Sequence, residues 1–276
     1  MNDAMPADTK TVLITGASSG IGLACAQRLA ARGLRVFASS RRASLAEPAP
    51  FEFVTMDVTS DESVGDAIER VLAASGRIDV LINNAGHVLA GPLELTDLRE
   101  ARAQFETNFF GVLRVCQAVL PSMRARQQGL IVNVGSLGGL IGMPYQGLYS
   151  ASKFALEGLT ETLRHELRPF GVRATIIEPG DIQTPITDNR IFARAARASS
   201  DYSPGFERTL VIIEREERAG PPPERVAALI DRIVHGGDPA PRYTVGAWSQ
   251  TSAALAKRLL PARVFEWAIA RFYALR

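Results

Sequence analysis

The sequence has few of the residues on which metal sites and disulfide-stabilised folds depend. It contains two cysteines and three histidines in 276 residues. Cys25 and Cys116 both fall in expected helices among apolar neighbours, which predicts packed thiols in a reducing compartment. No group of cysteines and histidines has the spacing of metal ligands, so we expect no metal site. His87, His165 and His235 are scattered, and we expect each to be structural or exposed rather than catalytic.

Long apolar runs and long runs of one charge are also missing. Nothing near 18 consecutive apolar residues occurs, so no membrane-spanning helix is expected. Residues 1–10 lack the apolar segment of a signal peptide, and we expect a cytoplasmic protein. The net charge is +2 without a long basic run, so nucleic acid is not an expected partner. The composition, 46% hydrophobic and 22% charged, is that of a globular protein.

A strand, a glycine-rich turn and a helix follow one another near the start of the sequence. Residues 11–15 are apolar and β-branched, which predicts a buried strand, and residues 23–32 predict a helix. The glycines between them, in the order G-x-x-x-G-x-G, let the backbone approach a phosphate at the helix N-terminus. A plain tight turn is the alternative, but the strand and helix around it favour a dinucleotide site. The expected contacts are Gly16, Ser18, Ser19, Gly20, Ile21 and Gly22.

The end of the second expected strand, residues 34–38, bears on the choice of dinucleotide. An acidic residue at this point would bind the ribose 2′-hydroxyl and favour NAD, but the sequence continues with Ser39, Ser40, Arg41 and Arg42. A guanidinium group can grip a 2′-phosphate through two hydrogen bonds. We therefore predict NADP(H) as cofactor, bound at this end by Ser40, Arg41 and Arg42. The alternative is that both arginines are solvated loop charges.

Expected strands and helices alternate along the whole chain. This order predicts an α/β fold, a single doubly wound Rossmann-type domain of residues 1–276 with a parallel sheet of about seven strands flanked by helices. Residues 185–220, without a clean period in their first part, are the expected substrate lid. Residues 247–276 are an expected helical C-terminal extension split by Pro261. We expect its last segment to pack on its own or a partner subunit; a membrane surface is the less favoured alternative.

Tyr149 and Lys153 lie four residues apart in an expected helix of about residues 146–170. That spacing places both side chains on one face. A phenol has a pKa of roughly 10, and a cation about 5 Å away can offset about two pKa units. The pair therefore predicts a tyrosine that exchanges protons near neutral pH. An isolated pair of this kind is more often ordinary helix surface, so the other motifs decide.

Polar and small residues follow several expected strands, at the sheet edge where ligands bind. Asp57 and Val58 close the third strand, where the carboxylate either binds the adenine amino group or caps the next helix. Ser136 follows the fifth strand. An apolar helical run of about residues 96–126 is expected, with a possible break near Asn108, a polar residue inside the run that therefore needs partners. The loop expected to pack on the cofactor contains Asn84, Ala85 and Gly86.

Together these motifs resemble the short-chain dehydrogenase/reductase family over roughly residues 10–187. The resemblance rests on residues 15–22, 57–58 and 83–86, on Asn108, Ser136, Tyr149 and Lys153, and on Pro179 and Gly180. Residues 154–158, 169–171 and 242–246 are similar to the branch that contains hydroxysteroid and retinol dehydrogenases.

The resemblance implies a role for each motif residue. Tyr149 is the general acid/base, Lys153 lowers its pKa and holds the nicotinamide ribose, and Ser136 binds the substrate oxygen. Asn108 holds a water in a proton relay that reaches Lys153. Thr184, after Pro179 and Gly180, contacts the nicotinamide amide. Tyr145, two turns from Lys153, is assigned to the pocket wall.

The predicted function is NADP(H)-dependent interconversion of a small hydrophobic ketone or aldehyde and its alcohol. The resemblance also implies a homodimer or homotetramer. A 3-ketoacyl thioester reductase is the main alternative. A non-catalytic dinucleotide sensor is a second alternative, which the presence of the whole serine, tyrosine and lysine set disfavours.

Overall fold

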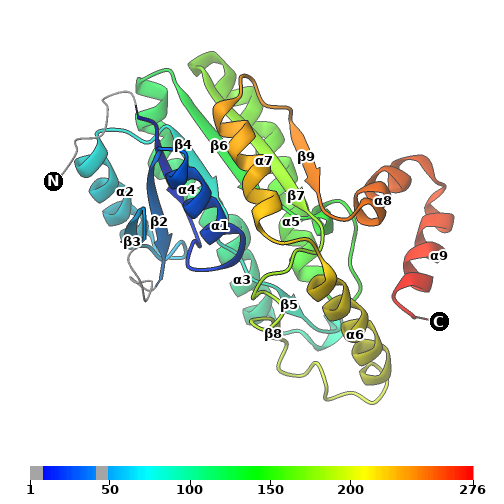
Figure 1. The fold of residues 1–276 in the computed structure, drawn as a ribbon. Coiled ribbons are helices and arrows are strands. Elements are labelled where there is room, and N and C mark those ends of the chain that lie inside the picture. Colours follow the sequence, from blue (N-terminus) through cyan, green and yellow to red (C-terminus); the bar gives the residue numbers. More distant parts are fainter. Residues whose placement is uncertain (1–8, 42–48, 276) are drawn as a thin grey trace.

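The fold is a seven-stranded sheet in the order β3-β2-β1-β4-β6-β7-β9, with helices on both faces (Figure 1). The computed structural model describes residues 9–41 and 49–275. Every neighbouring pair of strands is parallel, as expected. The strands are β1 (Thr11–Ile14), β2 (Arg35–Ser40), β3 (Glu52–Thr55), β4 (Val80–Asn83), β6 (Gly129–Val134), β7 (Val172–Pro179) and β9 (Arg242–Val245). The predicted α/β class and doubly wound sheet are confirmed.

Two apolar cores lie on opposite faces of this sheet. Alternate side chains of a strand point to opposite faces, so Val12 and Ile14 join one core while Leu13 joins the other. Helices α1 (Gly20–Ala31) and α7 (Glu224–His235) cover the first core. The second core is covered by α2 (Asp61–Ser75), α4 (Gly111–Ala125) and α5 (Gly147–Leu167). Burial on both faces explains why the strands read as continuous apolar runs.

The order of the strands reverses between β1 and β4. From β1 the chain adds β2 and β3 on one side, and β4, β6, β7 and β9 on the other. Parallel sheets of this kind open a crevice at the carboxyl ends of the strands on either side of the reversal. The glycine-rich turn follows β1, and residues 84–86 follow β4, so both lie at this crevice.

The long helical stretch before β6 is interrupted at the predicted point. Helix α3 (Leu98–Phe105) and helix α4 are joined by a π-helical segment, η2 (Glu106–Phe110), which contains Asn108. The wider turn rotates residues relative to a regular helix and often occurs at functional sites. Asn108 is fully buried there.

The sequence did not predict the small second sheet beside the crevice. Strands β5 (Leu89–Ala90) and β8 (Ile191–Phe192) pair in parallel across more than 100 residues of chain. Residues 89–90 and 191–192 are too short for a periodic signal. This sheet fixes the start of the expected lid stretch, which continues into α6 (Ser203–Ala219).

Helices α8 (Trp248–Leu259) and α9 (Ala262–Phe272) form the expected C-terminal extension and are separated at Pro261. Figure 1 shows both helices beside the sheet rather than on either of its covered faces. None of the helices among the described residues combines the length and apolar character needed to cross a bilayer. The short 3-10 segments are η1 (Leu93–Leu95), η3 (Leu137–Gly139) and η4 (Arg168–Phe170).

Candidate active site

A cavity of about 470 Å³ opens at the carboxyl ends of the strands. Its wall combines the ends of β4, β6 and β7 with residues of α5, α6, α8 and α9. Most of these residues are aliphatic or aromatic, and a few polar groups converge from α5 and from the loops after β6 and β7. Predominantly apolar pockets with a few placed polar groups are typical small-molecule sites.

Ser136, Tyr149 and Lys153 all line this cavity. The phenol of Tyr149 makes a hydrogen bond with the hydroxyl of Ser136. Ser136 also accepts a hydrogen bond from the backbone N–H of Gly138, at 3.0 Å, which fixes the direction of its hydroxyl. The Lys153 ammonium lies 5.9 Å from the centre of the Tyr149 ring and donates to the carbonyl of Val134 at 2.8 Å. Ser136, which lies 13 positions before Tyr149 and 17 before Lys153, is thus brought into one cluster with them.

The electrostatics of this cluster differ from the expectation. Burial raises the pKa of Tyr149 to about 12; the bond with Ser136 lowers it, whereas the charges of Glu217 and Asp181 raise it further. The predicted downward shift is therefore wrong for the chain by itself. Burial also lowers the pKa of Lys153 to about 8, against an opposing effect of Glu157. At neutral pH the phenol is protonated and can donate its proton.

Asn108 connects the π-helical segment to both walls of the site. Its Oδ1 accepts from the backbone N–H of His87 at 3.1 Å, and its Nδ2 donates to the His87 carbonyl at 3.1 Å and to Ser152 Oγ at 3.2 Å. Ser152 Oγ in turn donates to the carbonyl of Tyr149 at 2.7 Å. Asn108 therefore has the partners that its burial requires, and it holds the start of α5 against the loop after β4. Its role in a water relay stays a prediction.

The glycine-rich turn has the backbone geometry that a dinucleotide needs. Gly16 and Gly20 have φ of +65° and +56°. A Cβ on Gly16 would lie 2.6 Å from Ala85 Cα, and one on Gly22 would lie 2.5 Å from Asn84 Nδ2. Asn84 and Ala85 thus pack on the turn itself, and Asn84 Nδ2 donates to the carbonyl of Gly16 at 2.9 Å.

The first turn of α1 is open to an anion. Ser19 is its N-cap and makes no side-chain capping bond, so the first N–H groups of the helix receive no capping bond from this side chain. Ser18 and Ser19 are exposed, and Ile21 lines the cavity. A helix N-terminus behind a glycine turn suits a pyrophosphate, so the residues present fit a nicotinamide dinucleotide.

The region expected to bind the adenosine ribose is only partly described. Ser40 ends β2 and is buried, Arg41 is exposed, and Arg42 lies outside the described residues. Burial tends to raise the pKa of Asp57, but hydrogen bonds from Thr59 and the charges of Arg41 and Arg114 outweigh it and leave the pKa lowered. The effect of Arg41 on Asp57 indicates that the guanidinium lies near this edge of the sheet.

Asp57 and Val58 have local structural roles as well. The N-cap of α2 is Ser60, which accepts from the N–H of Ser63, so the alternative of Asp57 as helix cap is wrong. Asp57 Oδ1 instead accepts from Thr59 N–H at 2.9 Å. Val58 packs close to Gly111, where a Cβ would meet it at 2.8 Å. Binding of adenine by Asp57 stays a prediction.

Pro179, Gly180 and Thr184 line the cavity on the far side from α5. The Thr184 side chain lies 3.3 Å from the position of a Cβ on Gly20, so the loop after β7 closes over the glycine turn. Tyr145, assigned to the pocket wall, packs instead edge-on against Phe206 of α6 with ring centres 5.4 Å apart, and it is absent from the residues that line the cavity.

Sequence reasoning missed several polar residues of the wall, among them His87 and Asp181. His87 follows Gly86 directly, and Asp181 follows Gly180 directly; both line the cavity. Burial lowers the pKa of His87, helped by the charges of Arg41 and Lys153. Burial raises the pKa of Asp181 to about 7, and Glu217 and Glu216 add to the effect. Their positions next to motif residues were the available signal.

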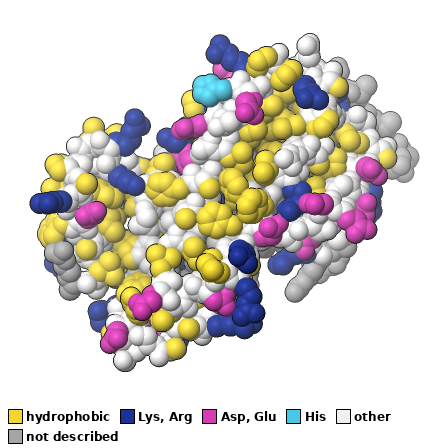
Figure 2. Space-filling model, turned by 180° about the vertical axis from the view of Figure 1, so that it is seen from behind, with side chains coloured by type: hydrophobic (Ala, Val, Ile, Leu, Met, Phe, Trp, Pro, Cys, Tyr) yellow, Lys and Arg dark blue, Asp and Glu magenta, His cyan; other side chains and the backbone are white. Residues whose placement is uncertain are grey.

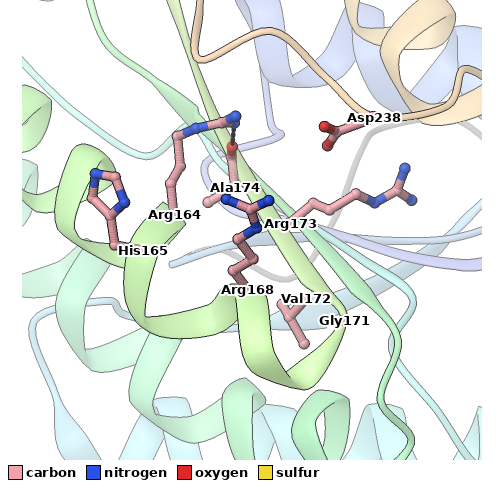
Figure 3. Close-up of a pocket in the computed structure, with 8 residues that line it drawn as sticks. All are labelled: Arg164, His165, Arg168, Gly171, Val172, Arg173, Ala174 and Asp238. Atoms are coloured by element: carbon pink, nitrogen blue, oxygen red, sulfur yellow. Dashed lines mark hydrogen bonds between the residues drawn. The ribbon is translucent and has the colours of Figure 1, made fainter.

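A second cavity, of about 390 Å³, lies at the opposite edge of the sheet, around the start of β7 (Figure 3). It is rich in basic residues, but Arg164 donates to the carbonyl of Ala174 and Arg173 to that of Gly237. These bonds tie the end of α5 and the start of β7 to neighbouring backbone. The cavity contains none of the groups of the Ser136 cluster, so the carboxyl-end cavity is the candidate active site.

Comparison with known proteins agrees with this geometry. Residues 10–194 match the family model described as short chain dehydrogenase. The 3-ketodihydrosphingosine reductase of Bacteroides thetaiotaomicron is 44% identical over 265 residues, which cover 96% of this chain and 98% of that protein. The estradiol 17-beta-dehydrogenase 1 of Rattus norvegicus is 37% identical over 86% of this chain and 73% of its own length.

Solved structures show the same fold. A short-chain dehydrogenase from Streptomyces avermitilis has a TM-score of 0.79 at 34% identity, covering 95% of this chain and 96% of the other. A short-chain dehydrogenase/reductase from Burkholderia phymatum in complex with NAD has a TM-score of 0.76 at 28% identity, with 95% of each chain covered. ElxO with NADP bound has a TM-score of 0.70 at 27% identity, covering 86% and 97%. Such likeness supports a nicotinamide dinucleotide as cofactor.

Lys153→Met should stabilise the cofactor-free protein. Folding lowers the pKa of Lys153 from 10.5 to about 8, so the folded state binds this proton more weakly than the unfolded chain. The destabilisation of the folded state by the charged Lys153 is complete below pH 8 and disappears as the pH rises toward 10.5. The shift corresponds to about 3 kcal/mol at pH 7. Met also lacks the hydrogen bond to the Val134 carbonyl, which is worth about 1 kcal/mol, so we expect the free energy of unfolding of Lys153→Met to exceed that of wild type by about 2 kcal/mol. Urea unfolding between pH 7 and 9.5 should show the difference narrowing.

Lys10→Met is the matched control. Lys10 also donates to a backbone carbonyl, that of Val234 at 2.8 Å, but its side chain is only partly buried. We expect no gain in stability from this substitution. A Lys153→Met protein less stable than wild type at pH 7 would contradict the prediction.

Proposed function

The chain belongs to the short-chain dehydrogenase family, and from that premise we propose that it is an NADP(H)-dependent oxidoreductase that interconverts a hydrophobic ketone and its alcohol. The single observation that carries the proposal is the cluster of Ser136, Tyr149 and Lys153 in the wall of a mainly apolar cavity above the glycine turn. Members of the family are oxidoreductases that act on CH–OH groups with a nicotinamide cofactor.

Tyr149 is the proposed general acid in the direction of reduction. Its phenol is protonated at neutral pH and hydrogen-bonded to Ser136, so the two hydroxyls can hold one carbonyl oxygen between them. Tyr149 donates its proton to that oxygen as the carbonyl carbon is reduced, and Ser136 stabilises the charge that develops. The bound dinucleotide supplies the hydride. The raised pKa favours reduction, since the acid form predominates at cellular pH.

Lys153 and Asn108 support that proton transfer. The ammonium of Lys153 is buried below the Tyr149 ring. Its positive charge stabilises the phenolate that forms when Tyr149 has given up its proton. Asn108 fixes the first turn of α5 through Ser152. We propose that it also positions a water through which the phenolate is reprotonated.

Arg41 supports the choice of NADP(H) over NAD. No carboxylate ends β2, and the exposed guanidinium of Arg41 is close enough to affect the pKa of Asp57 and of His87. A basic group at this edge of the crevice suits a 2′-phosphate. Arg42 is proposed as a second contact.

The proposed substrate is a long-chain amino ketone of the 3-ketodihydrosphingosine type. The relative that is 44% identical bears the name of that reductase, and the mainly apolar cavity suits an alkyl chain. Such a substrate carries an amino group next to the ketone. Asp181 supplies a carboxylate in the wall whose charge is felt at the Tyr149 phenol, which suits an ammonium close to the reacting carbon.

A 3-ketoacyl thioester reductase is the second candidate for this cavity. Asp181 disfavours it, since a thioester substrate brings no cation for this carboxylate. A non-catalytic sensor is disfavoured by the complete cluster. The expected homodimer or homotetramer remains a proposal.

Tyr149→Phe should abolish reduction while leaving cofactor binding intact. Removal of a general acid costs about 10²–10⁴ in rate. The measurement is NADPH oxidation with 3-ketodihydrosphingosine and with neutral long-chain ketones, alongside NADPH fluorescence to confirm binding. Tyr145→Phe, on the neighbouring turn, should keep near wild-type activity. Near wild-type turnover by Tyr149→Phe would refute the assignment, and wild type that binds NADPH but reduces none of these ketones would favour the sensor.

Arg41→Ala should raise the KM for NADPH and leave that for NADH unchanged. A charge-assisted contact to a phosphate is worth about 1.5–3 kcal/mol, so we expect a rise of about 10- to 100-fold. Arg70→Ala, an exposed arginine of α2, is the control and should change neither value. Equal use of NADH and NADPH by wild type would overturn the cofactor assignment.

Asp181→Asn should separate the amino ketone from neutral ketones. We expect its KM for 3-ketodihydrosphingosine to rise about tenfold or more, and its KM for a neutral ketone of equal length to change less than about twofold. Steady-state kinetics at pH 8, above the pKa of Asp181, provide the comparison. Equal losses on both substrates would show that Asp181 only maintains the cavity wall.

A further inference from the structure

The C-terminal extension exposes far more apolar surface than its length explains. The described residues leave 15 large hydrophobic side chains exposed, and eight of them lie within residues 248–275. They are Trp248, Leu255, Leu259, Leu260, Val264, Trp267, Phe272 and Leu275. Scattered exposed hydrophobic residues are normal, but such a concentration marks an interaction surface.

These side chains lie on the outer faces of α8 and α9. On α8 the spacing of Trp248, Leu255 and Leu259 places them on one side of the helix. On α9, Val264 and Trp267 share a side, while Phe265, Ala268 and Ile269 line the active-site cavity. The two helices thus use one face to close the cavity and leave the other uncovered among the described residues. We call the uncovered set Trp248, Leu255, Leu259, Val264 and Trp267 the outer patch.

The charge of the extension selects its partner. Residues 247–276 contain five of the 31 Lys and Arg residues and one of the 29 Asp and Glu residues, so they carry +4 and the remaining 246 residues carry −2. Arg258, Arg263 and Arg271 are exposed, and within residues 9–41 and 49–275 none of them forms an ion pair. In Figure 2, which is turned by 180° from Figure 1, α8 and α9 form the lobe on the left, where Lys and Arg side chains lie among many hydrophobic ones.

A second copy of the chain is a poor match for this surface. A twofold contact would bring the outer patch and its arginines against the same arginines of the partner. A bilayer with anionic lipids has the opposite charge, and each Lys or Arg near such a surface contributes attraction. Tryptophan is enriched at the boundary between headgroups and acyl chains. Both tryptophans of the chain belong to the outer patch, with 83% of Trp248 and 56% of Trp267 exposed.

We propose that α8 and α9 dock this protein on the surface of an anionic lipid bilayer, with the mouth of the active-site cavity facing the membrane. Phe272 and Leu260 are half-exposed and also line the cavity, so they form an apolar path from the outer patch to the reacting groups. An amphipathic helix with Trp on one side and Arg around it is the usual form of such an anchor. The sequence favoured packing of the last segment on its own or a partner subunit over contact with a membrane. We propose the reverse for the outer patch, because packing within the subunit uses only the cavity face of α9.

The docking goes beyond the proposed reaction and can be tested without substrate or cofactor. Because the outer patch holds both tryptophans, the intrinsic fluorescence of unmodified protein reports on it. We expect a blue shift on addition of vesicles of phosphatidylcholine with about one third phosphatidylglycerol, and quenching by lipids brominated near the headgroup. Sedimentation with the vesicles should give a matching binding curve, weakened by salt.

Variants separate the apolar from the electrostatic contribution. Leu255→Ser with Leu259→Ser should weaken sedimentation at least about tenfold while keeping the fluorescent reporters. Arg258→Glu with Arg263→Glu removes two positive charges, each of which should contribute about fivefold to vesicle binding, and adds two negative charges. This variant should therefore bind vesicles more weakly than removal of the two positive charges alone would predict. The controls are Leu98→Ser, whose side chain is 73% exposed on α3, and Arg70→Glu on α2; both should bind like wild type.

Three outcomes would overturn the proposal. No blue shift and no sedimentation with anionic vesicles would exclude docking. Equal binding to pure phosphatidylcholine would show that charge does not select the surface. A Leu255→Ser, Leu259→Ser protein that elutes at half the mass of wild type, with no lipid binding by either, would assign the outer patch to a subunit contact instead.

Discussion

The burial of one ammonium group sets the terms for the whole site. Lys153 is held 5% exposed beneath the ring of Tyr149, with the carbonyl of Val134 as its hydrogen-bond partner. A cation without a carboxylate partner in such a place is unstable, which is why its pKa falls to about 8. The end of β6, the start of α5 and the loop after β4 must all be rigid to keep it there. Asn108 and Ser152 provide that rigidity.

The sequence allowed the sheet and its flanking helices to be predicted, because each depends on patterns within a few residues. The grouping of Ser136, Tyr149 and Lys153 was predicted instead from the resemblance to the short-chain dehydrogenase/reductase family, because Ser136 is distant in sequence from the other two residues. The helix break near Asn108 was visible as a polar residue in an apolar run. What escaped was long-range: the pairing of β5 with β8, the packing of Tyr145 on Phe206, and the rise in the pKa of Tyr149 through burial. Burial by residues that are distant in sequence leaves no local signal.

The C-terminal helices belong both to the active-site cavity and to the surface proposed to bind a membrane. Their inner faces supply a third wall of the cavity, and their outer faces carry the exposed apolar side chains. If the opening of the cavity faces a bilayer, a substrate with a long alkyl chain can enter from the lipid without exposing its apolar surface to water, which would be unfavourable.

Gln250 ties that region to the reaction centre in atomic detail. Its amide donates to Asp181 Oδ2 at 2.6 Å and accepts from the Asp181 backbone N–H at 2.9 Å, directly after Pro179 and Gly180. Removal of the C-terminal helices to obtain a more easily handled protein would therefore remove these two hydrogen bonds, which hold the loop that closes over the glycine turn. Truncation would reduce the exposed apolar surface but would also disturb the active-site loop. A polar substitution on the outer face of α8 would reduce that surface and leave Gln250 in place.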